Sequence, residues 1–325
     1  MSHLVETMGY VGDVPWHGLG ENVIEHLKPG EKLTPEKFRT IAGLDWEVER
    51  APVYMKVGNK YIKIREHEAL YRNQDSQFFD MISPKWHEVK VKQAFEFFEE
   101  YCTQGGMHMH TAGSLQNGRY VWVMAKVDES FTLFRGKDRV ENNLLFTLPM
   151  IYGKKIDIRF TPVRVVCNNT LNLALQGKGD LAVSLNHRRA FDPESVKETL
   201  GIASDKLKKY EEMAKFLASK KAKEDDVVEY FAELFPATGK KAAAANDNEL
   251  VLSRPARLAL EALETQPGHQ YGAGTWWAPF NAVTYNADHV LGHSADTRLT
   301  SSWYGANRKK KIEALELALD YANAA

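Results

Sequence analysis

The side chains best suited to chemistry in this chain lie in one short stretch, FTPVRVVCNNTLNLAL at residues 160–175. The first half of the stretch has the β-branched residues typical of a strand, and the second half has leucines at helical spacing. Polar groups gather where the two halves meet, namely Arg164, Cys167, Asn168, Asn169 and Thr170. These residue types allow three interpretations, which differ in what the groups would bind.

In the first interpretation, Asn169 or Thr170 caps a helix, because short polar side chains accept hydrogen bonds from the free N–H groups at a helix start. In the second, the helix N-terminus and Arg164 form an anion site that suits a phosphate. In the third, Cys167 is a nucleophile. No histidine stands at a diagnostic spacing from it, so the fold would have to bring His17 or His187 close.

Cationic and aromatic residues alternate in a second stretch, YMKVGNKYIKIR at residues 54–65. Strands that carry lysine, arginine and aromatic residues can follow a phosphodiester chain and stack on bases. The stretch therefore predicts a nucleic-acid contact made by Lys56, Lys60, Tyr61, Lys63 and Arg65. The alternative interpretation is a solvated edge strand that lysines protect from aggregation.

Two further basic clusters are HRR at residues 187–189 and NRKKK at residues 307–311. They add six candidate nucleic-acid contacts: His187, Arg188, Arg189, Arg308, Lys309 and Lys310. The second cluster falls at a predicted helix start, where cations oppose the helix dipole. That misfit favours a ligand or an acidic partner, whereas the alternative is that these lysines face water.

Two histidine pairs have spacings that a metal site could use. His108 and His110 alternate on a predicted strand, and His289 and His293 are one helical turn apart. The chain has no CxxC or HExxH pattern, no GxxxxGK[ST] loop and no GxGxxG after a strand. We therefore predict no metal site, no cofactor and no catalytic residue, and leave open whether the protein is an enzyme.

The composition sets limits on the protein class. The chain has 325 residues, 44% of them hydrophobic, a net charge of −1 and two cysteines. This length can bury a large core, and the balanced charge argues against a general polyanion binder but permits a local basic groove. Two cysteines, no apolar run of about 18 residues and no visible export signal predict a cytoplasmic protein without a membrane partner.

The predicted elements give an α+β fold, with an antiparallel or mixed sheet of hairpins packed on helices and a mainly helical C-terminal part. Residues 1–30 are predicted to form a glycine-rich loop. Strand stretches are expected over 45–72 with a turn at Gly58–Asn59, on both sides of the Asn117–Gly118 turn, and over 142–148, 155–161 and 180–187. Helices are expected over 34–43, 89–103, 193–200, 204–220, 224–234, 253–264, 275–290 and 306–323.

The organisation along the chain is predicted from the same pattern. Residues 1–235 would form the α+β core, and residues 251–325 a helical segment that packs on it. Between them, residues 236–250 are small, polar and low in complexity, which is typical of a flexible linker.

Four motifs in this order carry a resemblance. They are WHGLG at 16–20, RVVCNNTL at 164–171, TWWAPFNAVTYNADH at 275–289 and WYGANRKKKIEALELAL at 303–319. Together they resemble the phage/plasmid-like protein family, catalogued as domain of unknown function 932, over about residues 8–323. Where the family pattern has a His-Thr pair, this chain has His187-Arg188-Arg189. The resemblance implies a phage or plasmid origin and an association with replication or recombination genes, but no catalytic mechanism.

These observations lead to a ranked set of functions. We expect a mobile-element protein that binds nucleic acid, with a preference for single-stranded DNA. It would bind or anneal single strands in recombination or replication. A homo-oligomer would be compatible with that role. The alternative is a non-catalytic interaction protein that modulates a host system. Its interface anchors would be Trp276, Trp277, Phe280, Trp303 and Tyr304, which would equally suit a helical core. A hydrolase that uses His17, His187 or Cys167 is ranked below both.

Overall fold

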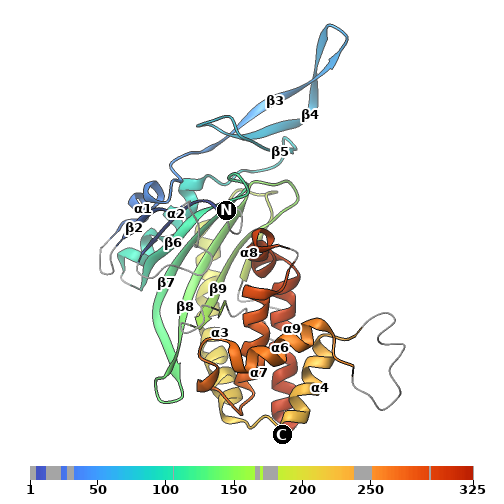
Figure 1. The fold of residues 1–325 in the computed structure, drawn as a ribbon. Coiled ribbons are helices and arrows are strands. Elements are labelled where there is room, and N and C mark those ends of the chain that lie inside the picture. Colours follow the sequence, from blue (N-terminus) through green and yellow to red (C-terminus); the bar gives the residue numbers. More distant parts are fainter. Residues whose placement is uncertain are drawn as a thin grey trace. The chain divides into compact units, whose positions relative to one another are not determined.

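The protein folds into a sheet-rich part and a helix-rich part, as the computed structural model shows (Figure 1). The structure describes residues 5–11, 23–27, 33–104, 106–164, 169–170, 182–237, 251–292 and 294–324. The α+β class is confirmed. The chain forms two interleaved compact units, of which unit 1 holds residues 1–128, 143–160 and 181–203, and unit 2 the remainder. Unit 2 thus takes residues from both sides of the boundary expected at residue 235.

The larger sheet is mixed. Its strands are β1 (Val5–Val11), β2 (Val23–Leu27), β6 (Met107–Leu115), β7 (Tyr120–Leu133), β8 (Asp138–Pro149), β9 (Ile156–Arg164), β10 (Asn169–Thr170) and β11 (Ala182–Leu185). Their order is β10-β9-β8-β7-β6-β1-β2, and β11 also pairs with β9. The β1–β2 pair is parallel, whereas β6 pairs antiparallel with both β1 and β7.

The predicted glycine-rich N-terminal loop is wrong for the residues that the structure describes, because β1 and β2 are strands. The glycine content of residues 1–30 suggested a loop, although the segment includes a short run of core residues. Val5, Met8 and Tyr10 are buried, and β1 continues the sheet beside β6. Gly9 fits here because a Cβ would lie 3.2 Å from the backbone of Ala42. The WHGLG motif lies outside the described residues.

The hairpin predicted around Asn117–Gly118 is confirmed, since β6 and β7 pair across this turn. Both turn residues have positive φ, 58° for Asn117 and 81° for Gly118, which these two residue types adopt most readily. The strand faces are apolar, and Trp122 is 1% exposed. A Cβ on Gly113 would overlap the Trp122 ring and the Thr7 carbonyl oxygen.

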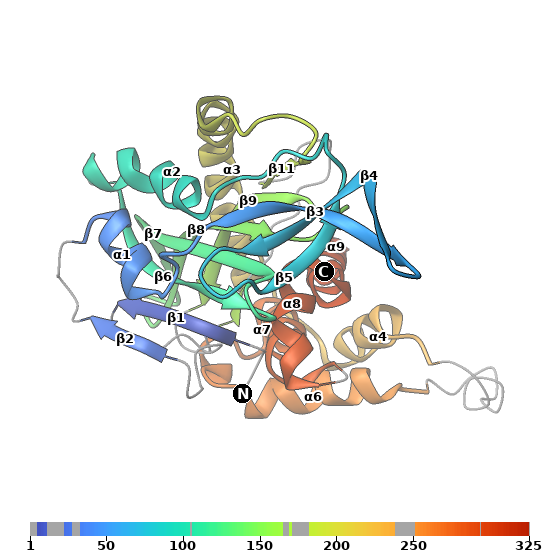
Figure 2. The ribbon, with the colours of Figure 1, turned by 90° about the horizontal axis from the view of Figure 1, so that it is seen from above.

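Two helices of unit 1, α1 (Pro35–Ile41) and α2 (Val91–Thr103), contact each other and β6 (Figure 2). The predicted start of α1 is confirmed: the Thr34 hydroxyl accepts a hydrogen bond from the Lys37 N–H, and Pro35 occupies the first turn. Helix α2 places Val91, Ala94, Phe95 and Phe98 in the core, as their spacing predicts.

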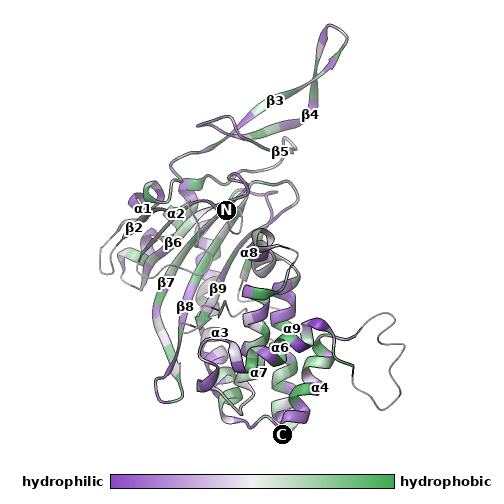
Figure 3. Cartoon of the chain, viewed as in Figure 1, coloured by the Kyte–Doolittle hydropathy of each residue, from purple (hydrophilic) through white to green (hydrophobic). Residues whose placement is uncertain are grey.

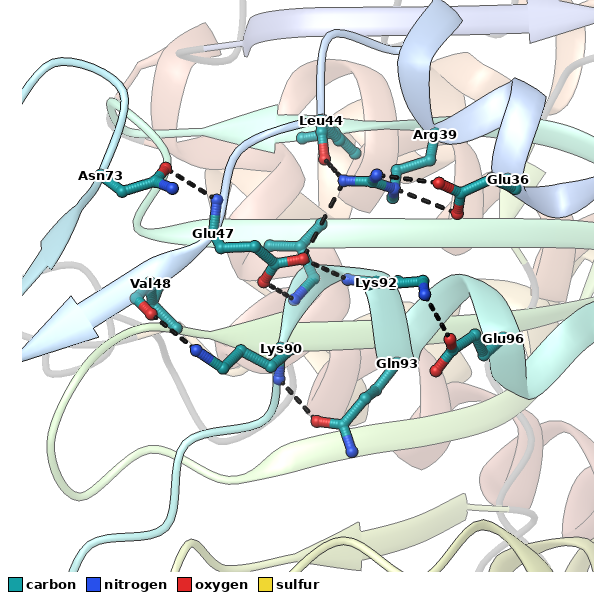
Figure 4. Close-up of polar contacts among 11 residues, drawn as sticks. Glu36, Arg39, Leu44, Glu47, Val48, Asn73, Lys90, Lys92, Gln93 and Glu96 are labelled. Carbon is teal, nitrogen blue, oxygen red and sulfur yellow. Dashed lines mark hydrogen bonds and ion pairs between the residues drawn. The ribbon is translucent and has the colours of Figure 1, made fainter.

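The start of α2 is completed by a residue far away in the sequence. Glu47 accepts hydrogen bonds from the N–H groups of Val91 at 3.1 Å and Lys92 at 3.2 Å (Figure 4). The Glu47 N–H in turn donates to the Asn73 side-chain oxygen at 3.0 Å. Glu47 directly precedes the second sheet of unit 1, so the cap fastens the base of that sheet to α2.

This second sheet has three strands in the order β3 (Val48–Val57), β4 (Lys60–Arg72) and β5 (Phe78–Ile82). Its base belongs to the core, where Val48, Leu70 and Ile82 are fully buried. The predicted turn at Gly58–Asn59 is confirmed, because Val57 pairs with Lys60.

Unit 2 contains most of the helices. The helical elements are α3 (Pro193–Ser219), which begins in unit 1, then α4 (Glu224–Leu234), α6 (Arg254–Thr265), η3 (His269–Tyr271), α7 (Trp277–Tyr285), η4 (Asn286–Val290), α8 (Ala295–Tyr304) and α9 (Ala306–Ala324). Two helices were predicted where α3 is continuous, and α8 was not predicted. Element η4 is a π-helical turn that extends α7.

Aromatic side chains form the core of this helical part. Trp276, Trp277 and Phe280 are completely buried, and Trp303 is 2% exposed. Trp276 also contacts Tyr230 and Tyr321 through its ring. Of the two uses considered for these aromatic residues, the core is therefore the one observed.

Within the described part of the chain, no helix combines the length and apolar character needed to cross a membrane. Residues 238–250, most of the expected linker, lie outside this part.

Candidate nucleic-acid interface

The distal half of the β3–β4 hairpin has two chemically different faces. Directly opposed residues in an antiparallel pair lie on the same face, and successive residues alternate between faces. The register pairs Tyr54 with Lys63 and Lys56 with Tyr61, which places a basic–aromatic face on one side. The other side carries an apolar face, made by the pairs Val53–Ile64 and Met55–Ile62, and by Val57 opposite Lys60.

Both faces are open to solvent. Tyr61 is 68% exposed and Tyr54 is 52% exposed, and Lys56, Lys60, Lys63 and Arg65 are also exposed. Of nine large hydrophobic side chains that are exposed in the described residues, five lie between Tyr54 and Ile62. The hairpin thus concentrates uncovered apolar and aromatic surface, and Figure 3 shows hydrophobic and hydrophilic residues mixed along both strands.

The charge of the distal hairpin has one sign. Residues 51–65 contain Lys56, Lys60, Lys63 and Arg65 and no carboxylate. The Lys56 ammonium lies 5.8 Å from the centre of the Tyr61 ring, in a cation–π contact across the strand pair. With no acid within this stretch, these cations create a positive potential that attracts anions.

Carboxylates near the hairpin base are engaged in holding it. Arg50 binds Glu68 at 3.0 Å and also contacts Glu88 and the Trp86 carbonyl oxygen. The Tyr71 hydroxyl donates to Glu49 at 2.8 Å. Between Pro52 and Val53 the register shifts, so that Arg65, Glu66 and His67 form a bulge on β4. Ion pairs and hydrogen bonds thus hold the base of the hairpin, and the distal half of the hairpin extends beyond this bulge.

The HRR cluster separates into buried and exposed members. His187 is 3% exposed and stacks on Trp86, with ring centres 4.0 Å apart. Its Nδ1 atom lies 2.8 Å from the His87 carbonyl oxygen, and burial lowers the pKa of the imidazole. The His187 ring is therefore not presented to solvent, and its position gives no support to the predicted nucleic-acid contact. Arg188 and Arg189 are exposed at the turn that follows.

The NRKKK cluster lies in the first turns of α9 and is largely internal. Lys311 forms a fully buried ion pair with Asp288, with Nζ and Oδ1 2.7 Å apart. Lys310 donates to the Leu234 carbonyl oxygen and binds Glu313 at 2.6 Å, and Lys309 lies 3.7 Å from the same carboxylate. Arg308 is half-buried. Asp288 and Glu313 thus supply acidic partners from within the chain, and of residues 307–311 Lys309 is exposed.

The junction near residue 164 is described only in part. Asn169 and Thr170 form β10 and pair with Arg164 and Val163 of β9. The residues that would form the predicted capped helix lie outside the described part of the chain, so the predicted cap stays a prediction. Asn168, Cys167 and His17 lie outside the described residues, as do the side chains of Arg164, Asn169 and Thr170.

Other reactive groups are dispersed. Among the described residues, no three histidine, cysteine or acidic side chains gather to hold a metal ion. His108 is exposed beside Asp128 at 3.1 Å, and His289 packs on Tyr285 with ring centres 4.8 Å apart. Burial raises the pKa of the Cys102 thiol to about 11, which disfavours the thiolate.

The structure therefore brings together five of the predicted contacts, all on β3 and β4: Lys56, Lys60, Tyr61, Lys63 and Arg65. The five predicted contacts leave out Tyr54, an aromatic residue of the same stretch that shares the face of Lys56, and the sequence analysis did not predict the apolar face. The signal for both was the strict alternation in VYMKV and YIKI, which assigns every second residue to one side.

Comparison with known proteins gives one match. A profile of the family described as "Domain of unknown function (DUF932)" matches residues 79–312, which is more than half of the chain. The match begins beyond β4, so the β3–β4 hairpin lies outside it. A search of curated proteins and a search of solved structures each found no match.

Proposed function

The chain belongs to the DUF932 family, and we propose that this protein binds nucleic acid, single-stranded DNA in preference, through the basic–aromatic face of its β3–β4 hairpin. The observation that carries the proposal is that face itself. Tyr54, Lys56, Tyr61 and Lys63 are exposed together, with no carboxylate within residues 51–65.

The physical case rests on two additive terms. The lysines attract the phosphates, and the exposed tyrosine rings offer stacking surface worth about 1–3 kcal/mol per base. Side chains on one face of a strand recur about every 6.8 Å, so the face presents regularly spaced contacts to an extended chain. A single strand suits this arrangement because its bases are free to stack.

The resemblance to phage/plasmid-like proteins supports a wider role for the protein. In that role it acts in the cytoplasm of a bacterial host, binds or anneals strands during recombination or replication, and assembles into a homo-oligomer. The alternative, an interaction protein without chemistry, would need anchors other than Trp276, Trp277, Phe280 and Trp303, because these are buried.

The deciding experiment measures the affinity for a labelled single-stranded oligonucleotide at several salt concentrations. Four hairpin cations give a slope of log K against log salt of about −3, or about 50-fold weaker binding between 50 and 200 mM salt. The variant Lys56→Glu/Lys63→Glu, which reverses both lysines of the basic–aromatic face, should abolish binding and keep the fold, because both side chains are exposed.

A matched control is Lys154→Glu/Lys155→Glu, which makes the same charge change at exposed residues outside the hairpin. It should bind within about twofold of the wild type. Equal losses in the two variants would show that net charge, rather than the hairpin, governs binding, and a wild type that binds no oligonucleotide would end the proposal.

A further inference from the structure

The apolar face of the hairpin has no role in the binding proposed above. Met55, Val57 and Ile62 are 49%, 52% and 48% exposed, and the neighbouring Val53 and Ile64 are half-buried. They lie on the side opposite Lys56 and Lys63. A hairpin that only tracked a phosphate backbone would carry polar residues there, since an uncovered apolar strand pair invites aggregation.

The size of the face limits what can cover it. A stable protein interface uses about 20–30 residues on each side, whereas this face offers five side chains, two of them already half-covered. A second copy or another protein would therefore gain little from this face alone. Insertion between base pairs requires only one or two apolar side chains.

The charge identifies the occupant. Any partner that reaches the apolar face also meets Lys60, at the end of that face, and approaches a hairpin whose opposite face carries Lys56 and Lys63. Nucleic acid satisfies both demands, because its bases are apolar and flat and its backbone is anionic. A second copy would bring another set of four cations instead.

The geometry points to a strand-separating wedge, in which the apolar face of the β3–β4 hairpin packs against the last base pair of a duplex. The basic–aromatic face meanwhile holds the unpaired strand that leaves that duplex. The substrate class is thus a junction between single-stranded and double-stranded DNA. This inference rests on the proposed function, because it needs the basic–aromatic face to bind a strand.

The test uses the full chain and three labelled DNAs: a single strand, a blunt duplex, and a duplex with a single-stranded tail. A 2-aminopurine base at the junction reports unstacking. We expect the wild type to bind the tailed duplex about tenfold more tightly than the single strand and to raise the 2-aminopurine fluorescence. Met55→Ser/Ile62→Ser should bind the single strand within about twofold of the wild type and lose both the preference and the signal.

The control is Phe78→Ser/Met81→Ser, which removes two exposed apolar side chains from β5 and should keep the junction preference. If the wild type binds single strands without preferring the junction, and Met55→Ser/Ile62→Ser binds them equally well, the wedge is overturned and the proposed function stands. A DNA-free dimer that Met55→Ser/Ile62→Ser dissociates would assign the face to a second copy. Absence of all DNA binding would instead remove the proposed function itself.

Discussion

Lys311 shows how a residue that looks like part of a basic patch can have a structural role. Its side chain is fully buried and bound to Asp288, which is also fully buried, in the π-helical turn η4. A lysine near a helix N-terminus opposes the helix dipole, and the carboxylate of Asp288 offsets that cost. Taking both charges out of water is costly, and their close contact offsets that cost. Removing one partner therefore leaves the other charge buried and destabilises the fold.

We predict that Lys311→Met destabilises the protein by about 3–5 kcal/mol, because it leaves the Asp288 carboxylate buried without its ammonium partner. Urea unfolding followed by circular dichroism measures the change in free energy.

The double variant Lys311→Met/Asp288→Asn should recover part of that loss, since the uncompensated charge is gone. Lys309→Met, at an exposed position of the same cluster, should change the stability by less than about 0.5 kcal/mol. A Lys311→Met protein as stable as the wild type would mean that Asp288 is satisfied without Lys311.

At the scale of the element, helix α2 depends on a cap that comes from outside the helix. Lys90 occupies the N-cap position without a side-chain cap hydrogen bond, and the Gln93 side chain accepts from its N–H. The carboxylate of Glu47 supplies the missing acceptors for two further N–H groups and places negative charge at the positive end of the helix dipole.

We predict that Glu47→Ala lowers the free energy of unfolding by about 1 kcal/mol, the usual cost of a lost N-cap. Glu96→Ala is the control, because Glu96 forms only an exposed ion pair with Lys92 on the same helix. Equal effects from the two substitutions would show that Glu47 acts as an ordinary surface charge.

The elements differ in how far sequence patterns could predict them. Long periodic helices, the Thr34 cap and the two turns at Gly58–Asn59 and Asn117–Gly118 were predicted, because each depends on local chemistry. Strand β1 was not, since Gly9 and the glycines that follow it in the sequence resemble a loop, and pairing with β6 makes it a strand. The pairing of Asn169 and Thr170 with Arg164 and Val163 was not predicted either, because these residue types suit a helix cap as well as a strand end.

The candidate interface, too, could be predicted only as far as local sequence patterns define it. The cations and Tyr61 of β3 and β4 were predicted from the sequence, and the alternation assigns faces within each strand, but only the register shows which residues of the two strands share a face. By contrast, the burial of His187 and Lys311 depends on Trp86 and Asp288, residues distant in the sequence. Charge runs in a sequence therefore mark candidates, and only the fold separates a surface cation from a structural one.

At the scale of the whole molecule, the distal hairpin carries the proposed function but adds no buried residue, since residues 53–67 are all half-buried or exposed. Its side chains are exposed on both faces, whereas Val48, Leu70 and Phe79 at the base belong to the core. Arg50 and its two carboxylates hold the base on the near side of the bulge. Stability and binding should therefore be separable by shortening the hairpin.

We predict that replacing residues 54–63 with Asn-Gly removes nucleic-acid binding and changes the free energy of unfolding by less than about 1 kcal/mol. Val53 and Ile64 are directly opposed, so a two-residue type I′ turn can close the shortened hairpin. Thermal unfolding and oligonucleotide binding, measured on the same preparation, test both halves of the prediction. A shortened protein that still binds with the wild-type salt dependence would move the interface to other predicted cations, and Arg188, Arg189 and Lys309 are exposed. A shortened protein that unfolds at a much lower temperature would show that the distal hairpin is part of the structural core.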